Sequence, residues 1–466
     1  MKNSSIAVRL LAPFLMAAVG LRLADAAELK VYPPPPHEPA FEDCSVAVNE
    51  TSVFVFKATV NRSAPNHGIV PETVGFASFD FSGEAHVTIT TKQQFKSVEV
   101  RPRSRAVVPA VEDKTIRFTL SQPCKLCLEW NGSDKRPLFL FANAIESYPG
   151  GTPRPGEDRV RYFAPGVHQA GEIRPKSGET IYIAGGAIVY GKIAADAVRG
   201  VRVLGRGILD GSHWKQWETN LVSFRDSSDV EIRGIILRDS PCWTVVPSRC
   251  DRVTVADVKI LNYRKNSDGI NSVNSRHVTV EDCFVRNYDD SIVVKATQPD
   301  TQDVEDITVR NCVVWCDWGF SLGMTYEARV AHIRHLLFQD CDVLHGMACR
   351  GVLGVKNGDR ATVSDVCFEN IRIEDARVQL LELVIDRDMW SKDDERGHIQ
   401  GVVFRNIALT GGAFVPSALA GHDAEHRVED VTFENVRIHG KLVNSVEQGK
   451  IRTNAHVKNV RFLPGR

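Results

Sequence analysis

The stretch Val278-Thr-Val-Glu-Asp-Cys283 and its counterpart Ile307-Thr-Val-Arg-Asn-Cys312 decide the fold of this chain. Both alternate apolar and polar residues, which is the period of a β-strand. The same six-residue pattern recurs through the C-terminal two-thirds of the sequence, in segments that begin at Val230, Val253, Val278, Ile307, Leu336, Val366, Val402 and Val431.

The spacing of these segments indicates a solenoid. Their fifth residues follow one another at intervals of 23 to 36 residues, and repeats in this range indicate stacked supersecondary units. The segments between them show turns and little helical periodicity, so β-helix coils fit better than helical or leucine-rich repeats. We therefore predict an all-β chain whose residues 165–466 form a right-handed parallel β-helix.

Two columns of equivalent residues support this prediction. The fifth position of the segments holds Gly234, Asp257, Asp282, Asn311, Asp340, Asn370, Asn406 and Asn435. Asn and Asp tolerate the left-handed conformation of a tight bend, so we expect a bend at this point of each coil. The next position holds Cys283, Cys312 and Cys341 in successive coils. We interpret these cysteines as an interior ladder of small apolar groups and not as metal ligands.

Residues 28–145 follow a different pattern. Alternating runs such as 52–60, 85–91, 97–101, 115–120 and 138–142 have irregular spacing, which predicts a small antiparallel β-sandwich. A stretch rich in proline and glycine, 148–156, marks a linker. Because the exposed end of a solenoid needs cover, we expect the sandwich to cap or flank the first coil.

Composition and the N-terminus suggest where the protein works. The 466 residues carry a formal net charge of −1, which gives no reason to expect a nucleic-acid or membrane partner. Residues 1–26 resemble an export signal, with Lys2 and Arg9 before an apolar run and Ala24-Asp25-Ala26 at its end. We therefore expect a secreted or periplasmic monomer.

The cysteine count is odd, at eleven, so at least one thiol has no partner within the chain. Cys124 and Cys127 form a single Cys-x-x-Cys motif. Without a second pair this motif is weak evidence for a metal or redox site. A local disulfide or buried thiols in a sheet are the better interpretation.

Two consecutive coils carry acidic residues at matching positions. One coil reads Asn266-Ser-Asp268-Gly-Ile, and the next reads Asp289-Asp290-Ser-Ile. Aligning Gly-Ile with Ser-Ile places Asp268 one coil below Asp290, with Asp289 beside it. Continuing the alignment predicts that Trp318 and then Arg350 extend the same column.

Three carboxyl groups at one place repel each other, so at least one pKa should rise and produce a proton donor beside ionised neighbours. An inverting glycosidase needs such a pair, because one carboxylic acid protonates the leaving oxygen and one carboxylate activates water. A tryptophan offers a face on which a sugar can stack. The alternatives are that Asp289 and Asp290 form a solvated loop pair or bind calcium, and that Trp318 points into the core.

At these residues the chain resembles the polygalacturonase family of β-helix glycosidases and its dextranase and isopullulanase relatives. Asn266-Ser-Asp-Gly269 and Asp289-Asp290 are similar to that family's Asn-Thr-Asp-Gly and Asp-Asp motifs in type and spacing, and the segment 203–211 is similar to its early coils. The sandwich that precedes the repeats resembles the layout of dextranases. The resemblance extends over roughly residues 165–440.

The resemblance implies a role for each acid. Asp289 would be the general acid, Asp268 and Asp290 would orient and activate water, and Asn266 would contact sugar near the cleavage point. No metal or cofactor is implied, and the partner would be a polysaccharide or oligosaccharide.

The chain departs from the family at two motifs. Trp318 stands where the family has the histidine of Gly-His-Gly, and Gly351-Val-Leu-Gly-Val-Lys356 stands where it has Gly-Val-Arg-Ile-Lys. Those basic residues hold a uronate carboxylate in polygalacturonases, so their partial loss favours a neutral or differently charged glycan. Arg350 and Lys356 remain candidates for a cationic subsite, and with Asn266 and Trp318 they form the predicted substrate-binding set.

Two other functions share this architecture. A polysaccharide lyase would need a Brønsted base, often calcium, and a uronate substrate, and its product would absorb in the ultraviolet. A non-catalytic glycan-binding β-helix would not need an acid triad. The presence of Asp268, Asp289 and Asp290 favours hydrolysis over both.

Overall fold

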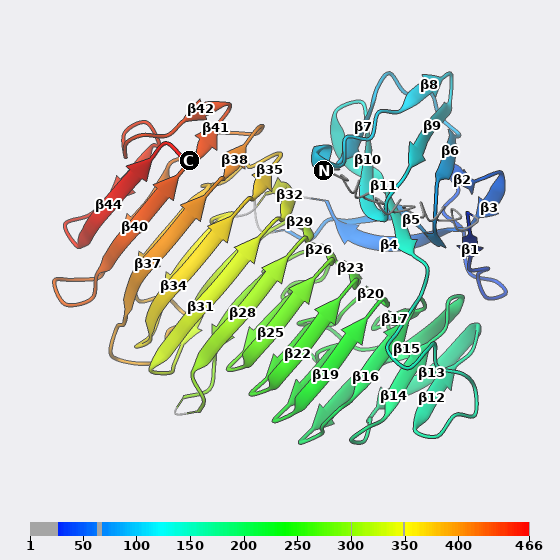
Figure 1. Ribbon diagram of the computed structural model, residues 1–466, viewed down its shortest axis with the longest axis horizontal. Helices are drawn as coiled ribbons and strands as arrows, with labels where there is room; N and C mark the ends of the chain where they lie inside the picture. The colour runs from blue at the N-terminus through cyan, green and yellow to red at the C-terminus, as the bar shows by residue number, and fades with distance from the viewer. Residues whose placement is uncertain (1–26, 63–67, 300, 348–349, 466) are drawn as a thin grey trace, which may run out of the picture.

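The computed structural model describes residues 27–62, 68–299, 301–347 and 350–465. These ranges form a β-sandwich followed by a parallel β-helix (Figure 1). The predicted export signal, residues 1–26, lies outside the described residues. No helix in the ranges described is long and apolar enough to cross a membrane.

The sandwich consists of two sheets that enclose a separate apolar core. One sheet contains β1 (Leu29–Val31), β4 (Val55–Asn61), β5 (Pro71–Phe81), β7 (Val98–Arg101), β10 (Cys124–Trp130) and β11 (Ser133–Ala144). The other contains β2 (Cys44–Val48), β3 (Thr51–Val53), β6 (Ala85–Thr91), β8 (Ala110–Glu112) and β9 (Thr115–Leu120), and η1 (Arg103–Arg105) is a short 3-10 turn. The sandwich is not wholly antiparallel as predicted, because β5 and β11 run parallel.

The segments that decided the fold form the first face of the β-helix. They are strands of a 12-stranded parallel sheet: β12 (Val160–Phe163), β14 (Thr180–Ile183), β16 (Arg202–Gly205), β19 (Ser228–Arg233), β22 (Asp251–Ala256), β25 (Arg276–Glu281), β28 (Val304–Arg310), β31 (His332–Gln339), β34 (Thr362–Glu369), β37 (His398–Arg405), β40 (Val428–Glu434) and β44 (Val457–Leu463). The helix therefore starts at Val160, slightly before the predicted residue 165.

The other two faces belong to one 21-stranded sheet that bends around a corner. The second face contains β13 (Gly166–Ile173), β15 (Ala187–Asp196), β17 (Ile208–Asp210), β20 (Ile236–Arg238), β23 (Lys259–Leu261), β26 (Phe284–Asn287), β29 (Val313–Cys316), β32 (Asp342–Gly346), β35 (Arg372–Ile373), β38 (Ala408–Leu409), β41 (Arg437–Ile438) and β42 (Lys441–Leu442).

The third face contains β18 (Val222–Arg225), β21 (Val245–Ser248), β24 (Ile270–Val273), β27 (Ile292–Ala296), β30 (Leu322–Ala328), β33 (Leu353–Asn357), β36 (Leu381–Ile385), β39 (Ser417–Ala420) and β43 (Ile451–Thr453). The coils wind into a right-handed parallel β-helix, which confirms the predicted fold class.

The bends between the first and second faces are where the sequence predicted them. All eight marker residues, from Gly234 to Asn435, have positive φ angles. The asparagines also form a side-chain ladder, in which the Asn406 amide donates to Asn370 at 2.9 Å and the Asn435 amide donates to Asn406 at 2.8 Å. A residue in the left-handed conformation thus closes each of these coils, and in the last three of them its side chain is hydrogen-bonded to a neighbouring coil.

The interior is filled by ladders of like residues. Cys283, Cys312 and Cys341 are fully buried in the core, as predicted. Successive phenylalanines of the first face stack with ring centroids 4.9 to 5.3 Å apart, from Phe338 to Phe462. Cys124 and Cys127 are buried thiols in β10, and every cysteine within the described ranges is free.

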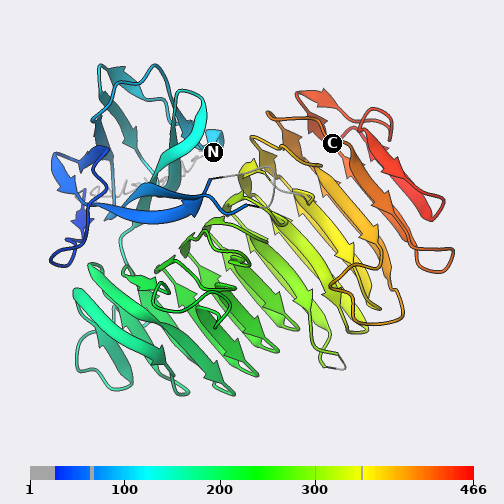
Figure 2. The ribbon, with the colours of Figure 1, turned by 180° about the vertical axis from the view of Figure 1, so that it is seen from behind.

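The sandwich lies along the side of the β-helix and does not cover its end (Figures 1 and 2). Phe139 and Phe141 of β11 each pack 5.2 Å from Phe284 of β26, measured between ring centroids. Buried ion pairs join the same surfaces, including Arg101 with Glu374 at 2.6 Å and Arg206 with Asp80 at 3.0 Å. The sandwich therefore flanks several coils and not the first alone.

The asparagine ladder predicts an unusual response to mutation at an exposed position. Replacing Asn406 with Ala should cost about 1–2 kcal/mol more than replacing it with Gly, because Gly adopts the left-handed bend without the steric cost that the Cβ of Ala carries. Both variants lose the ladder hydrogen bonds, worth about 1 kcal/mol. Equilibrium urea unfolding measures the difference, with Asn444→Ala, an exposed asparagine outside the ladder, as the control. Equal stability of the Ala and Gly variants would contradict this account.

Candidate active site

The three acidic residues lie in the turns that lead from the second face to the third. Asp268 lies two residues before β24, and Asp289 and Asp290 lie shortly before β27. Because Ile270 pairs with Ile292, Asp268 and Asp290 occupy equivalent positions in adjacent coils, as the sequence alignment predicted. The stacking of parallel strands thus brings carboxyl groups from two coils together.

A buried lysine, which the sequence analysis did not select, holds these carboxyl groups. Lys295 of β27 places its Nζ 2.9 Å from Asp290 Oδ2 and 3.3 Å from Asp268 Oδ2. Glu327 Oε2 lies 3.9 Å from the same nitrogen. The Lys295 side chain is only 6% exposed, so the cation and its acidic partners form one compact cluster. A lone lysine in the apolar run Ile-Val-Val-Lys-Ala was the available signal.

Asp290 is fixed as a hydrogen-bond acceptor. Its Oδ1 accepts from the backbone N–H of Phe320 at 2.8 Å, and its Oδ2 accepts from the hydroxyl of Thr325 at 3.0 Å. Gly319 packs directly against Asp290, where any Cβ would collide with it. The next coil therefore closes over Asp290 and holds its carboxylate in one orientation.

Asp268 is almost completely buried, yet only one of its oxygens has partners. Its Oδ2 accepts from the Asn271 amide at 2.9 Å and faces Lys295. Its Oδ1 has no hydrogen-bond partner among the described residues. This buried oxygen thus keeps unused hydrogen-bonding capacity, at a residue that lines the cavity described below.

Burial and mutual repulsion change the proton affinity of the cluster. Loss of solvation and the neighbouring Asp290 charge raise the pKa of Asp289 to about 7. Loss of solvation also raises the pKa of Asp268 well above its usual range, against the lowering effect of Lys295. The direction of both changes is the one expected where several carboxyl groups share a poorly solvated cavity.

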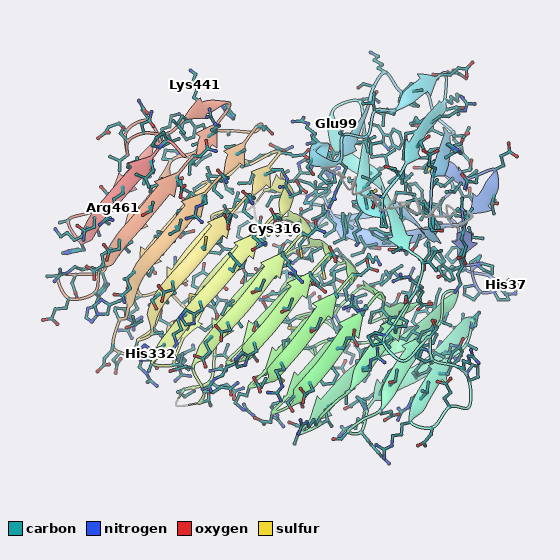
Figure 3. The ribbon with its side chains drawn as sticks, viewed as in Figure 1. His37, Glu99, Cys316, His332, Lys441 and Arg461 are labelled. Carbon is teal, nitrogen blue, oxygen red and sulfur yellow. The ribbon has the colours of Figure 1, made fainter. Side chains whose placement is uncertain are left out.

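A thiol supports the backbone at Asp289. Cys316, marked near the middle of the ribbon in Figure 3, donates from its Sγ to the carbonyl oxygens of Asp289 and Gly319, each at 3.2 Å. The side chain is fully buried, and loss of solvation raises its pKa well above the usual range. Cys316 is thus an uncharged donor that ties the two turns together.

The predicted extension of the acid column to Trp318 and Arg350 is wrong. Ile292 pairs with Leu322, and Leu322 pairs with Leu353, so the residues in register with Asp290 are Phe320 and Gly351. Phe320 is fully buried. The turn 317–321 is longer than the turn 288–291, and its extra length carries Trp318 outward from the column.

Trp318 and Arg350 nevertheless reach the same cavity as the acids. This cavity has a volume of about 260 Å³. It is lined by Trp243, Lys265, Asn266, Asp268, Tyr288, Asp289, Asp290, Lys295, Trp318, Gly319, Tyr326, Glu327, Arg350, Met389 and Trp390. Trp318 is partly exposed and stacks on Tyr288 at a centroid distance of 6.5 Å, so it does not point into the core.

Two of the predicted substrate-binding residues are already engaged by the protein. Asn266 lines the cavity, but its Oδ1 accepts from the indole N–H of Trp217 at 3.1 Å. Lys356 does not line the cavity; its side chain is 5% exposed and its Nζ lies 3.4 Å from both Asp386 and Asp388. The cationic subsite expected at Lys356 is therefore occupied by the protein's own carboxylates.

The sequence analysis also missed most of the aromatic residues that line the cavity. Trp243 is in register with Asp268 in the preceding coil, and Lys295 Nζ lies 4.7 Å from its ring centroid. The ring centroid of Tyr326 in β30 lies 4.9 Å from Cζ of Arg350 and 5.0 Å from Nζ of Lys356. Trp243 also lines a larger groove of about 610 Å³ over β18 and β21. The position of Trp243 one coil before Asp268 was a usable signal.

Comparisons with known proteins assign the chain to a family. The family model described as Glycosyl hydrolases family 28 matches residues 188–460. A probable polygalacturonase of Vitis vinifera is 30% identical over 203 residues, which cover 41% of this chain and 36% of that protein. The chain spans about a third of the length of the curated relatives it matches first.

Solved structures share the fold. A hyperthermoactive exopolygalacturonase from Thermotoga maritima has a TM-score of 0.51 at 16% identity, covering 66% of this chain and 84% of that one. Dex49A from Penicillium minioluteum has a TM-score of 0.58 at 13% identity, covering 92% and 96%. These two likenesses concern the fold alone. The family match spans more than half of the chain and includes all three acids, and the chain therefore belongs to glycosyl hydrolases family 28.

Proposed function

We propose that this protein is a secreted glycoside hydrolase that cleaves a polysaccharide with inversion at the anomeric carbon, using Asp289 as general acid. The observation that carries the proposal is the raised pKa of Asp289, about 7, beside two further carboxyl groups and a buried cation. Membership of family 28 supports the reaction class. The export pattern in residues 1–26 supports secretion, and we expect the protein to act as a monomer.

The chemistry divides between the acids. Protonated Asp289 donates its proton to the glycosidic oxygen as the bond to the anomeric carbon breaks. Asp290 accepts a proton from the attacking water molecule, and Asp268, whose Oδ1 has no hydrogen-bond partner among the described residues, helps to orient that water. Lys295 contacts both of these carboxyl groups, and its positive charge reduces the electrostatic repulsion between them.

The cavity wall supports a sugar ligand. Trp243, Trp318 and Tyr288 offer flat faces for the apolar side of a pyranose ring. Of the predicted binding residues, we retain Asn266, Trp318 and Arg350 as substrate contacts. Lys356 acts in this proposal through the acidic residues that it binds and not through the sugar.

Replacing Asp289 with Asn should lower turnover by several orders of magnitude while preserving the fold. An amide cannot protonate the leaving oxygen, and general acid catalysis contributes about 10²–10⁴-fold. Because Asp289 has a raised pKa, its contribution to stability is complete below about pH 4 and is lost as the pH rises through about 7. The variant should therefore melt at or above the wild-type temperature at pH 8. Retention of more than about a tenth of the wild-type rate would rule out Asp289 as the acid.

The pH dependence of kcat/KM should reveal the same group. Activity requires protonated Asp289, so kcat/KM should fall about tenfold per pH unit above a pH near 7. An aspartate with its ordinary pKa would place this limb near pH 4. Steady-state assays between pH 4 and 9, with circular dichroism at each pH to confirm folding, locate the limb. A fall in kcat/KM that begins near pH 4 would mean that the pKa of Asp289 is not raised.

The first product formed should carry the inverted anomeric configuration. Direct displacement by water leads to inversion, whereas a glycosyl-enzyme intermediate leads to retention. Proton NMR of the anomeric region during the first minutes of reaction reads the outcome before mutarotation. Early appearance of the retained anomer would exclude the proposed mechanism, and an unsaturated product would identify a lyase.

A further inference from the structure

The segment 386–397 forms a second wall of the active-site cavity. This segment, the 386–397 loop, connects β36 to β37 and leaves the third face at the edge opposite to the acids. Met389 and Trp390, at its tip, are 77% and 46% exposed, and both line the cavity that contains the three acids. The loop thus brings an aromatic ring from a distant coil to the catalytic cluster.

A buried carboxylate fixes the C-terminal half of the loop. Asp359 follows β33 and is fully buried. Its Oδ1 accepts from the backbone N–H groups of Lys392 at 2.7 Å and Asp393 at 2.8 Å, while its Oδ2 accepts from the N–H of Ala328 at 3.1 Å. Gly358 approaches Ser391 so closely that a Cβ there would meet its hydroxyl at 2.7 Å. Asp359 therefore joins the loop to two coils of the β-helix.

Ion pairs fix the other parts of the loop. Lys356 Nζ lies 3.4 Å from both Asp386 and Asp388, and Arg350 approaches Asp388 at 3.8 Å. Arg329 contacts Asp393 at 3.2 Å. Lys356 and Arg350, two of the basic residues that would otherwise attract a carboxylate-bearing sugar, are thus engaged by carboxylates of the loop.

An anchored loop with an exposed aromatic tip is suited to bind a ligand. Met389 and Trp390 together expose a large apolar surface at the mouth of the cavity, and such grouped apolar surface is suited to contact with another molecule. Because the loop is held at several points, little conformational entropy is lost when a ligand docks on the ring. The apolar face of a pyranose matches a tryptophan in size and polarity.

We propose that Trp390 is the stacking platform for a sugar ring bound beside the acids, that Asp359 positions this platform, and that the ring is an uncharged pyranose. This inference rests on the proposed function, because it concerns the same cavity. The absence of a carboxylate on the sugar follows from the engagement of Lys356 and Arg350 by the loop and from the surplus of acidic groups around Lys295.

The experiment measures binding and cleavage separately. Binding of neutral glucan and galactan oligosaccharides and of oligogalacturonate is measured by calorimetry in the Asp289→Asn background, and cleavage is measured with active enzyme. For the best neutral ligand, Trp390→Ala should raise the Kd and lower kcat/KM, each about 5- to 100-fold. Trp390→Phe should keep most of the wild-type affinity and activity. Leu463→Ala, an exposed apolar residue in β44, is the control and should change neither.

Asp359 is tested as a positioning residue through its coupling to Trp390. Asp359→Ala should raise KM more than it lowers kcat, while Asp359→Asn, which keeps an acceptor oxygen, should restore KM. The double variant Asp359→Ala/Trp390→Ala should bind no more weakly than Trp390→Ala alone, because both changes remove the same platform. Fully additive effects would show that Asp359 acts elsewhere.

The outcomes separate this inference from the proposed function. If Trp390→Ala changes the Kd of the best ligand less than twofold, the platform is disproved even when hydrolysis occurs. If oligogalacturonate binds more tightly than every neutral glycan, the assignment of an uncharged sugar is wrong. If neutral glycans bind in a Trp390-dependent manner but the active enzyme releases no product, the platform stands and the hydrolase proposal fails.

Discussion

The in-register stacking of parallel strands is the constraint on which the rest of the structure depends. Each backbone group pairs with the equivalent group one coil away, so residues at the same position in successive coils become neighbours. The left-handed Asn and Asp residues keep this register by closing each coil at the same point. The same geometry produces the cysteine and phenylalanine ladders inside and the acid cluster outside, because it converts a sequence repeat into contact.

In the acid cluster, the unfavourable burial of several carboxyl groups is partly offset by contacts from neighbouring coils. Three carboxyl groups in a poorly solvated cavity destabilise one another, and the pKa of Asp289 rises in response. Lys295 offsets part of this cost by contacting Asp268 and Asp290, and backbone and hydroxyl donors hold Asp290. The carboxyl groups of the cluster therefore differ in proton affinity, and the proposed acid–base cleavage depends on such a difference.

The sandwich and the 386–397 loop support the site from outside the solenoid. Arg286 of β26 donates both to Asp317, next to Trp318, and to the carbonyl oxygen of Asn61 in the sandwich. The sandwich is thereby connected to the turn that carries Trp318. The loop performs a similar function at the opposite edge, where Asp359 fixes its backbone. Of the two, only the loop lines the cavity itself, through Met389 and Trp390.

The sequence by itself determined the repeat, the bends, the cysteine ladder and the alignment of Asp268 with Asp290, because each depends on local pattern and on a repeat that stacks in register. It also supplied the acid triad, since two adjacent coils carry it.

Only the tertiary structure decided the partners of those acids. Lys295, Trp243 and Trp390 reach the cavity from three different coils, and turns of unequal length moved Trp318 and Arg350 out of the predicted column. Lys356 could not be assigned from sequence either, because its acidic partners lie in a loop that folds back from the next coil. Such contacts depend on loop paths and side-chain packing, which have no fixed spacing along the chain.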